Sequence, residues 1–302
     1  LELQATPPAD SYINTKSLLN NNINPLDLYF CNNCSHTQLG HVIDAEEVYM
    51  NYIYETESTL GLGSHFKDCA NKIIAKFSPP KGSLVLDIGS NDGILLKYFK
   101  DHELNVLGVD PMPGIDEKAL KLGIKTLSRF FDNDLVDIIK KDYQVPSIIS
   151  SNNLVANIDD LDSFILNVRS LMDNNTIFFF ESFYFYSQVL NNNWDFTYHE
   201  HLSYFTISPL KKYFNSHDME IIDVESNNTK GGSMRVTVQK KGGSQKINSS
   251  VNKFIKNEED NNFNTKIIFK KYDNNIKSGK QEYRSFMDSI IKENKKIIGF
   301  GA

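Results

Sequence analysis

The sequence predicts an α/β protein whose sheet is mostly parallel and covered by helices on both faces. Short apolar segments alternate with segments whose apolar residues recur at helical spacing. Strands that are apolar throughout need cover on both faces, and parallel neighbours need a crossover helix between them. The predicted strands of this kind are 83–89, 106–110, 147–150 and 176–181.

Helices are predicted around these strands. From about Thr59 to Phe77 the apolar residues share one helical face, and Pro79-Pro80 stops the helix. After about residue 185 an aromatic, polar stretch interrupts the alternation. The remaining expected elements are helices over 94–99, 117–122, 161–171 and 209–217, and strands over 219–224 and 233–239.

The predicted organisation has three parts. Residues 1–58 form a small module of turns and short strands, and residues 59–240 form the main domain. Residues 241–302 begin with one or two solvated helices over 245–290. The last residues, Lys296 to Ala302, predict a strand and a glycine turn that open a further α/β domain, truncated here.

Composition excludes several classes of protein. The 302 residues carry 32 Lys and Arg against 38 Asp and Glu, so the net charge of −6 does not favour a nucleic-acid partner. The sequence has no continuous apolar run of roughly 18–20 residues, which argues against a membrane protein. Three cysteines cannot form a disulfide framework, so we expect a cytoplasmic protein.

The strongest motif is LDIGSNDG, Leu86 to Gly93, between the first strand and a helix. Gly89 and Gly93 let the backbone approach a ligand, and Asp110 closes the next strand, where a carboxylate can accept hydrogen bonds from both hydroxyls of a ribose. The spacing matches neither the dinucleotide Gly-x-Gly-x-x-Gly nor a phosphate-binding Gly-Lys-Ser/Thr. It therefore favours S-adenosylmethionine over NAD or ATP.

A second group of ionisable residues is Tyr198-His199-Glu200-His201. His201 is a candidate general base because an ordinary imidazole titrates near neutral pH. Glu200 or Tyr198 could orient it or polarise a carbonyl. A polar loop packed between domains explains the pattern equally well, and a His-x-His zinc site is a further alternative.

Cys31-Asn32-Asn33-Cys34 is half of a zinc site, because structural zinc takes four ligands. Either His36 and His41 complete the site, or a second cysteine pair lies upstream of Leu1; we favour the second.

A further motif places two glycines just before a predicted strand, in the sequence Lys230-Gly231-Gly232-Ser233-Met234-Arg235. Arg235 could grip a phosphate or carboxylate there, although a plain hairpin turn explains the pattern nearly as well.

Taken in order, these motifs resemble the bacterial sugar C-methyltransferases, which use S-adenosylmethionine on nucleotide-linked keto-deoxysugars. The resemblance runs from about Pro7 to Ala302. It is carried by Cys31-x-x-Cys34, Tyr52-x-Tyr54, VLDIGSNDG (85–93), LGVDP (107–111), SNN (151–153), YHEHLSYF (198–205) and GGSMRV (231–236).

The resemblance implies a class I methyltransferase domain, Rossmann-like with a mostly parallel seven-stranded sheet. It also implies a small N-terminal zinc-ribbon-like module, whose first cysteine pair precedes Leu1, and the start of a C-terminal α/β domain. The protein would be a monomer or a homodimer that acts on a small molecule. By motif, the residues that hold the cofactor would be Asp87, Gly89, Asn91, Gly93, Asp110 and Asn153.

The resemblance also implies roles in the sugar site. Tyr198, Glu200 and His201 would be catalytic, with His201 as the base, and the other substrate-binding residues would be Tyr52, Tyr54, Asn157, Lys230 and Arg235. Asn157 and Lys230 stand where the family commonly has histidines, which leaves open which sugar is bound and whether carbon or oxygen is methylated. An O-methyltransferase and a non-catalytic zinc-bearing module are the alternatives.

Overall fold

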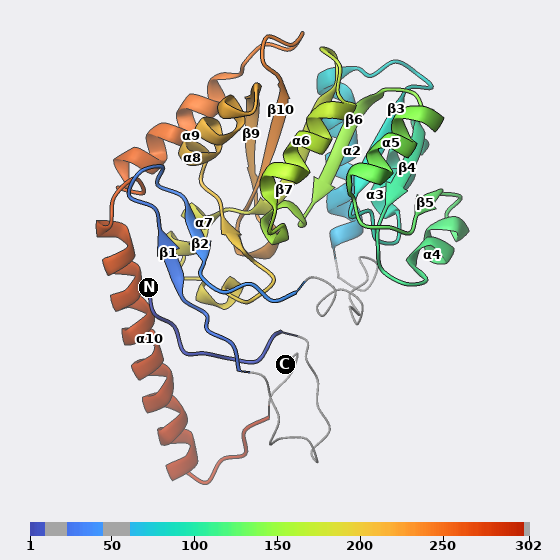
Figure 1. The fold of residues 1–302 in the computed structure, drawn as a ribbon. Helices are drawn as coiled ribbons and strands as arrows, with labels where there is room; N and C mark the ends of the chain where they lie inside the picture. Colours follow the sequence, from blue (N-terminus) through green and yellow to red (C-terminus); the bar gives the residue numbers. More distant parts are fainter. Residues whose placement is uncertain (10–22, 45–60, 299–302) are drawn as a thin grey trace.

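The computed structural model describes residues 1–9, 23–44 and 61–298. Its centre is a seven-stranded sheet in the order β5-β4-β3-β6-β7-β10-β9 (Figure 1). The first five strands of this order run parallel, and β10 is antiparallel to both of its neighbours. The strands are β3 (Leu84–Ile88), β4 (Asn105–Val109), β5 (Thr126–Leu127), β6 (Pro146–Asn152), β7 (Ile177–Phe183), β9 (Met219–Asn227) and β10 (Ser233–Lys240). The predicted mostly parallel α/β sheet is confirmed.

Two hydrophobic clusters cover the two faces of this sheet. Alternate residues of β7 divide between them, with Ile177 and Phe179 in one and Phe178 and Phe180 in the other. The first cluster holds residues of α2 (Leu62–Phe77), α3 (Ile94–Lys100) and α4 (Ile115–Lys121). The second holds residues of α5 (Asn133–Asp142), α6 (Leu161–Leu171), α7 (Phe185–Leu190) and α8 (Ile207–Ser216).

A small second sheet attaches the N-terminal residues to the main domain. It contains β1 (Leu28–Phe30), β2 (Thr37–Leu39) and β8 (Ser203–Tyr204), all antiparallel. Thr37 of β2 lies opposite Tyr204, and the Leu39 N–H donates to the Leu202 carbonyl at 2.8 Å. Leu28 and Leu39 are buried in the same cluster as Phe178 and Phe180. The N-terminal residues therefore share the core of the main domain.

Two helices end the described chain, α9 (Ser249–Asp260) and α10 (Ile267–Lys292). In Figure 1, α10 lies along the N-terminal residues, where the Lys280 ammonium donates to the Gln4 side chain at 3.3 Å. The strand predicted from Lys296 is not formed over 295–298, and Ile298 is 88% exposed. A strand needs a partner for its backbone groups, and the described residues offer none to this segment. None of the helices in the described part of the chain has the length and apolar character of a membrane span.

Candidate active site

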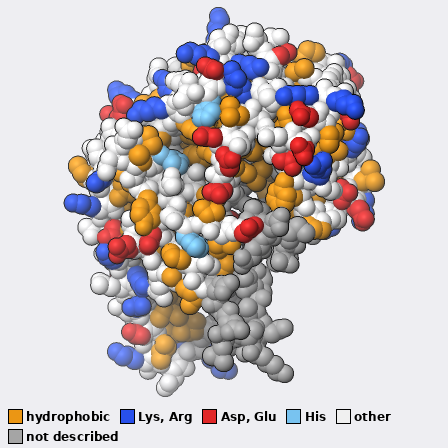
Figure 2. Space-filling model, in the orientation of Figure 1, with side chains coloured by type: hydrophobic (Ala, Val, Ile, Leu, Met, Phe, Trp, Pro, Cys, Tyr) orange, Lys and Arg blue, Asp and Glu red, His pale blue; other side chains and the backbone are white. Residues whose placement is uncertain are grey.

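A cavity of about 580 Å³ opens at the carboxyl ends of β3, β4 and β6. Its wall includes the loop after β3, the segment 198–202 and residues 42–44 of the N-terminal module. In Figure 2 acidic side chains gather around a hollow in this face of the molecule. Ligands of open α/β sheets bind at such strand ends.

The loop after β3 forms one end of the cavity. Gly89 and Gly93 have φ angles of +75° and +78°, which side chains other than glycine rarely adopt. A Cβ on Gly89 would stand 2.9 Å from the Leu154 side chain. The Asp110 carboxylate accepts hydrogen bonds from the backbone N–H groups of Asn91 and Met112, both at 2.9 Å. Asp110 thus fixes this loop against the end of β4.

Polar atoms at the same end have no hydrogen-bond partner among the described residues. They are the Ser90 hydroxyl and both polar atoms of the Asn152 amide, and both residues line the cavity. Buried polar atoms are seldom left unpaired in folded proteins. Together with Asp110 they form a donor and acceptor set that fits an adenosyl group. We did not predict Ser90 and Asn152 individually, although both stand inside motifs that the sequence shows.

Asp87 and Gly93 support the loop. Asp87 lines the cavity, but its carboxylate is buried and accepts a hydrogen bond from Ser150 at 2.7 Å. Burial raises the pKa of Asp87 to about 7. Gly93 does not line the cavity; it precedes α3, and a Cβ there would press on Ile124 at 3.2 Å.

His201 lies at the other end of the cavity, packed against two aromatic rings. Its ring centroid is 4.0 Å from that of Tyr198 and 4.3 Å from that of Phe183. Its Nδ1 lies 2.8 Å from the Phe196 carbonyl oxygen. A carbonyl only accepts, so Nδ1 carries the hydrogen and Nε2 is left with a lone pair. Burial lowers the pKa of His201 to about 3, which keeps the ring neutral at physiological pH.

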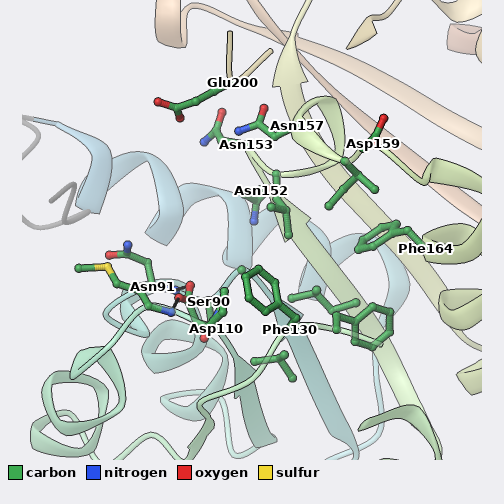
Figure 3. Close-up of a pocket in the computed structure, with 18 of the residues that line it drawn as sticks. Ser90, Asn91, Asp110, Phe130, Asn152, Asn153, Asn157, Asp159, Phe164 and Glu200 are labelled. Carbon is green, nitrogen blue, oxygen red and sulfur yellow. Dashed lines mark hydrogen bonds between the residues drawn. The ribbon is translucent and has the colours of Figure 1, made fainter. Parts of the chain in front are cut away.

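Several predicted residues gather near this end. Figure 3 places Asn153, Asn157 and Glu200 close to one another, with Ser90 and Asp110 across the cavity. Lys230 lines the same cavity, and its pKa is lowered by burial, against which the charge of Glu200 acts. The predicted cofactor and sugar residues Gly89, Asn91, Asp110, Asn153, Asn157, Tyr198, Glu200, His201 and Lys230 therefore share one cavity.

Arg235 lies elsewhere, which corrects the prediction of a substrate contact. Its neighbours Met234 and Val236 enter the core with Phe178, so alternation sends Arg235 to the opposite face of β10. There its Nε donates to the Glu181 carboxylate at 2.8 Å, and a terminal nitrogen pairs with Glu225 at 3.3 Å. The two-pronged grip of the guanidinium is on carboxylates of the protein. His65 of α2 contacts the same Glu181 at 2.6 Å.

Cys31 and Cys34 lie in the turn between β1 and β2. Among the described residues no group of three or more His, Cys, Asp or Glu side chains could hold a metal. His41 instead contacts Asn24 at 3.1 Å, and burial lowers the pKa of His36, which lies against Phe205, to about 4. In this structure these histidines therefore do not stand with Cys31 and Cys34 as a ligand group. Two thiols do not make a structural zinc site on their own.

Residues that the sequence did not predict also line the cavity, and two predicted tyrosines cannot be placed in it. Tyr52 and Tyr54 lie outside the described residues. Val42 and Asp44 of the N-terminal module line the cavity, which no pattern in the sequence indicates. His199 also lines it, and its Nε2 donates to the Asn24 carbonyl at 3.2 Å. The N-terminal module thus contacts the segment Tyr198–His201 directly.

Comparison with known families identifies the main domain. Residues 64–224 match a family model described as a methyltransferase domain. The chain belongs to the methyltransferases. Residues 228–302 of this methyltransferase match a C-methyltransferase C-terminal domain, and residues 1–49 match a model named "Putative zinc binding domain". The likeness to a C-methyltransferase model is thus confined to residues 228–302.

A curated relative supports the same family. The C-methyltransferase NovU of Streptomyces niveus is 24% identical over 278 residues, which are 92% of this chain and 66% of the relative. The chain thus spans slightly less than two thirds of that relative.

Solved structures are also similar. The magnesium protoporphyrin IX methyltransferase of Synechocystis PCC 6803 is 12% identical, with a TM-score of 0.47 over 60% of this chain and 84% of that one. An S-adenosylmethionine-dependent methyltransferase of Clostridium acetobutylicum is 14% identical, with a TM-score of 0.46 over 59% and 92%.

Proposed function

We propose that this methyltransferase takes a methyl group from S-adenosylmethionine and adds it to a carbon next to the ketone of a nucleotide-linked keto-deoxysugar. One observation carries the proposal: the glycine loop with Asp110 and the Tyr198–His201 segment line opposite parts of one cavity. The match to a C-methyltransferase domain and the likeness to NovU support carbon as the acceptor. The sugar class rests on the family resemblance.

The chain supplies the cofactor site and the base. Asp110, Ser90 and Asn152 would hold the adenosyl group beside the glycine loop. S-adenosylmethionine supplies a methyl group on a positively charged sulfur. His201 is held neutral, and its Nε2 lone pair can accept the proton from the carbon next to the ketone. The ring does not turn freely, because Nδ1 is bonded to Phe196 and the ring packs against those of Phe183 and Tyr198.

The test separates carbon from oxygen methylation. A thymidine-diphosphate 4-keto-6-deoxyhexose is incubated with the protein in deuterated water, without S-adenosylmethionine. Removal of a carbon-bound proton predicts deuterium incorporation next to the ketone, seen by NMR and mass spectrometry. Calorimetry with S-adenosylmethionine is run in parallel. Methyl transfer to the sugar without any exchange would support an O-methyltransferase, and absence of both binding and exchange would remove the proposal altogether.

A further inference from the structure

The base at the end of the cavity needs help with the chemistry proposed for it. A proton next to a ketone is only weakly acidic, and removing it places negative charge on the ketone oxygen. An imidazole whose pKa is about 3 is a weak base, so the transfer of that proton to it has little driving force. Stabilisation must then come from a group that faces the developing oxygen anion. A cation close to His201 would supply it.

Cations are scarce on the cavity wall. Among the described residues that line it, the Lys and Arg side chains are Arg129 and Lys230, against seven carboxylates. Arg129 follows β5 and pairs with Asp132 at 3.8 Å. Figure 3 places the adjacent Phe130 toward the part of the cavity that holds Ser90 and Asp110. Lys230 is the other cation of this wall, and it lines the same cavity as His201.

The charge of Lys230 interacts with two residues of the segment Tyr198–His201, namely His201 and Glu200. It contributes, after burial, to lowering the pKa of His201. Burial lowers the pKa of Lys230, and the carboxylates of Glu200 and Glu181 act in the opposite direction. Two nearby carboxylates favour the ammonium form over the neutral amine. Geometry agrees with this, because a Cβ on the next residue, Gly231, would stand 3.2 Å from the ring of Phe196, whose carbonyl binds His201. Lys230 therefore enters the cavity wall on the side of the imidazole.

The backbone holds Lys230 in a position that costs energy. Its φ and ψ are 50° and 41°, in the left-handed region that non-glycine residues rarely occupy. The turn is braced from one side by Asn193, whose amide donates to the Gly231 carbonyl at 3.0 Å. It is braced from the other by Ser233, whose hydroxyl donates to the Thr229 carbonyl at 3.0 Å. Strained residues that the surroundings hold in place are typical of functional sites.

We propose that the Lys230 ammonium binds the substrate's ketone oxygen and stabilises the enolate that forms when His201 takes the neighbouring proton. This inference rests on the proposed function. In the step, the proton moves from carbon to Nε2 of His201, the C–H pair becomes a C=C bond, and the carbonyl pair moves onto oxygen. Lys230 stays protonated throughout. When the new carbon–carbon bond forms, the oxygen pair restores the ketone, and the pair of the breaking methyl–sulfur bond stays on sulfur.

Deuterium exchange without S-adenosylmethionine tests Lys230 separately from methyl transfer. The probe is again a thymidine-diphosphate 4-keto-6-deoxyhexose. Lys230→Met removes the charge, Lys230→Arg keeps it, and Lys241→Met is the matched control, since Lys241 is exposed at the end of β10. We expect exchange about 10²–10³-fold slower for Lys230→Met, a smaller loss for Lys230→Arg and no change for the control.

A second measurement distinguishes catalysis from folding. With Lys230→Met the acid limb of the exchange rate should move to higher pH, because His201 no longer feels the ammonium. Affinity for S-adenosylmethionine and the unfolding midpoint should stay as in wild type. If wild type exchanges and Lys230→Met matches it within twofold, this inference fails and the proposed function stands. Trapping of Lys230 by borohydride with the probe would show a covalent imine and would also overturn it. Without exchange by wild type, both proposals fail.

Discussion

The Nδ1–H of His201 donates to the carbonyl oxygen of Phe196 across 2.8 Å, and this one contact fixes which ring nitrogen can act as a base. Phe196 belongs to the same loop, five residues earlier. A nearby backbone carbonyl thus sets the tautomer of His201, and the aromatic rings of Tyr198 and Phe183 restrict the plane of its ring. Removing water from the imidazole keeps it neutral.

Replacing His201 should abolish proton removal while leaving cofactor binding intact. We expect His201→Ala to slow deuterium exchange by about 10²–10⁴-fold, the usual contribution of a positioned base. His217→Gln is the control, because His217 ends α8 and contacts Tyr213 and Asp162 away from the cavity. The wild-type rate should fall only as the pH approaches 3, where His201 gains a proton. An unchanged rate for His201→Ala would assign the base elsewhere.

Asp110 should control affinity for S-adenosylmethionine. In Asp110→Asn an amide nitrogen replaces one of the two oxygens that accept from Asn91 and Met112. We expect the dissociation constant to rise at least about tenfold, or about 1.4 kcal/mol, by calorimetry. Asp137→Asn, on the exposed side of α5, should bind as wild type does. Equal affinity in both variants would contradict a cofactor role for Asp110.

Arg235 should matter for stability. Arg235→Met leaves the Glu181 carboxylate buried without its main cation, which typically costs about 3–5 kcal/mol of unfolding free energy. The double variant Arg235→Met/Glu181→Met should recover part of this loss in urea titrations. Binding of S-adenosylmethionine should not change. A stable Arg235→Met protein with a greatly raised KM for the sugar would instead restore the original prediction of a substrate contact.

Glu258 of α9 should make stability depend on pH. Its carboxylate is buried and accepts from the backbone N–H groups of Ile207 and Ser208 at the start of α8. Burial raises its pKa from 4.5 to about 7, so the folded state holds the proton more tightly than the unfolded state. Its contribution is full below pH 4.5 and is lost as the pH rises through 7, on the order of 3 kcal/mol.

Urea titrations at several pH values test this slope. Glu258→Gln should flatten the dependence between about pH 4.5 and 7 compared with wild type. Glu282→Gln, exposed on α10, should keep it. The same slope in all three proteins would show that Glu258 does not titrate in this window.

The N-terminal hairpin should be needed for catalysis more than for cofactor binding. Gln38 lies in the middle of β2, opposite Ser203 of β8, and its side chain is exposed. Gln38→Pro removes a backbone donor from a strand paired on both sides, whereas Gln38→Ala keeps it. We expect only the proline variant to lose deuterium exchange, with S-adenosylmethionine binding retained by both. If Gln38→Pro still exchanges deuterium at the wild-type rate, the hairpin does not position the segment Tyr198–His201.

Much of the main domain could be predicted because its signals are local. Apolar strands and helical spacing predict β3, β4, β6 and β7 within a few residues. The glycine loop was predictable as well, since its conformation depends on Gly89 and Gly93 themselves. The assignment of Arg235 failed for a physical reason. A guanidinium suits a substrate phosphate and a buried glutamate equally well, and only the facing of β10 and β7 decides between them.

The sequence by itself determined the α/β fold, the glycine loop after β3 and the presence of a tyrosine–histidine segment, because each depends on residues close together in the chain. The tertiary structure alone decided that this segment and the loop line one cavity, that Val42 and Asp44 join its wall, and that Lys230 lines it together with His201. These contacts join residues far apart in the chain. They depend on the order of the strands and on the face of the sheet from which each side chain projects, and a local sequence pattern predicts neither.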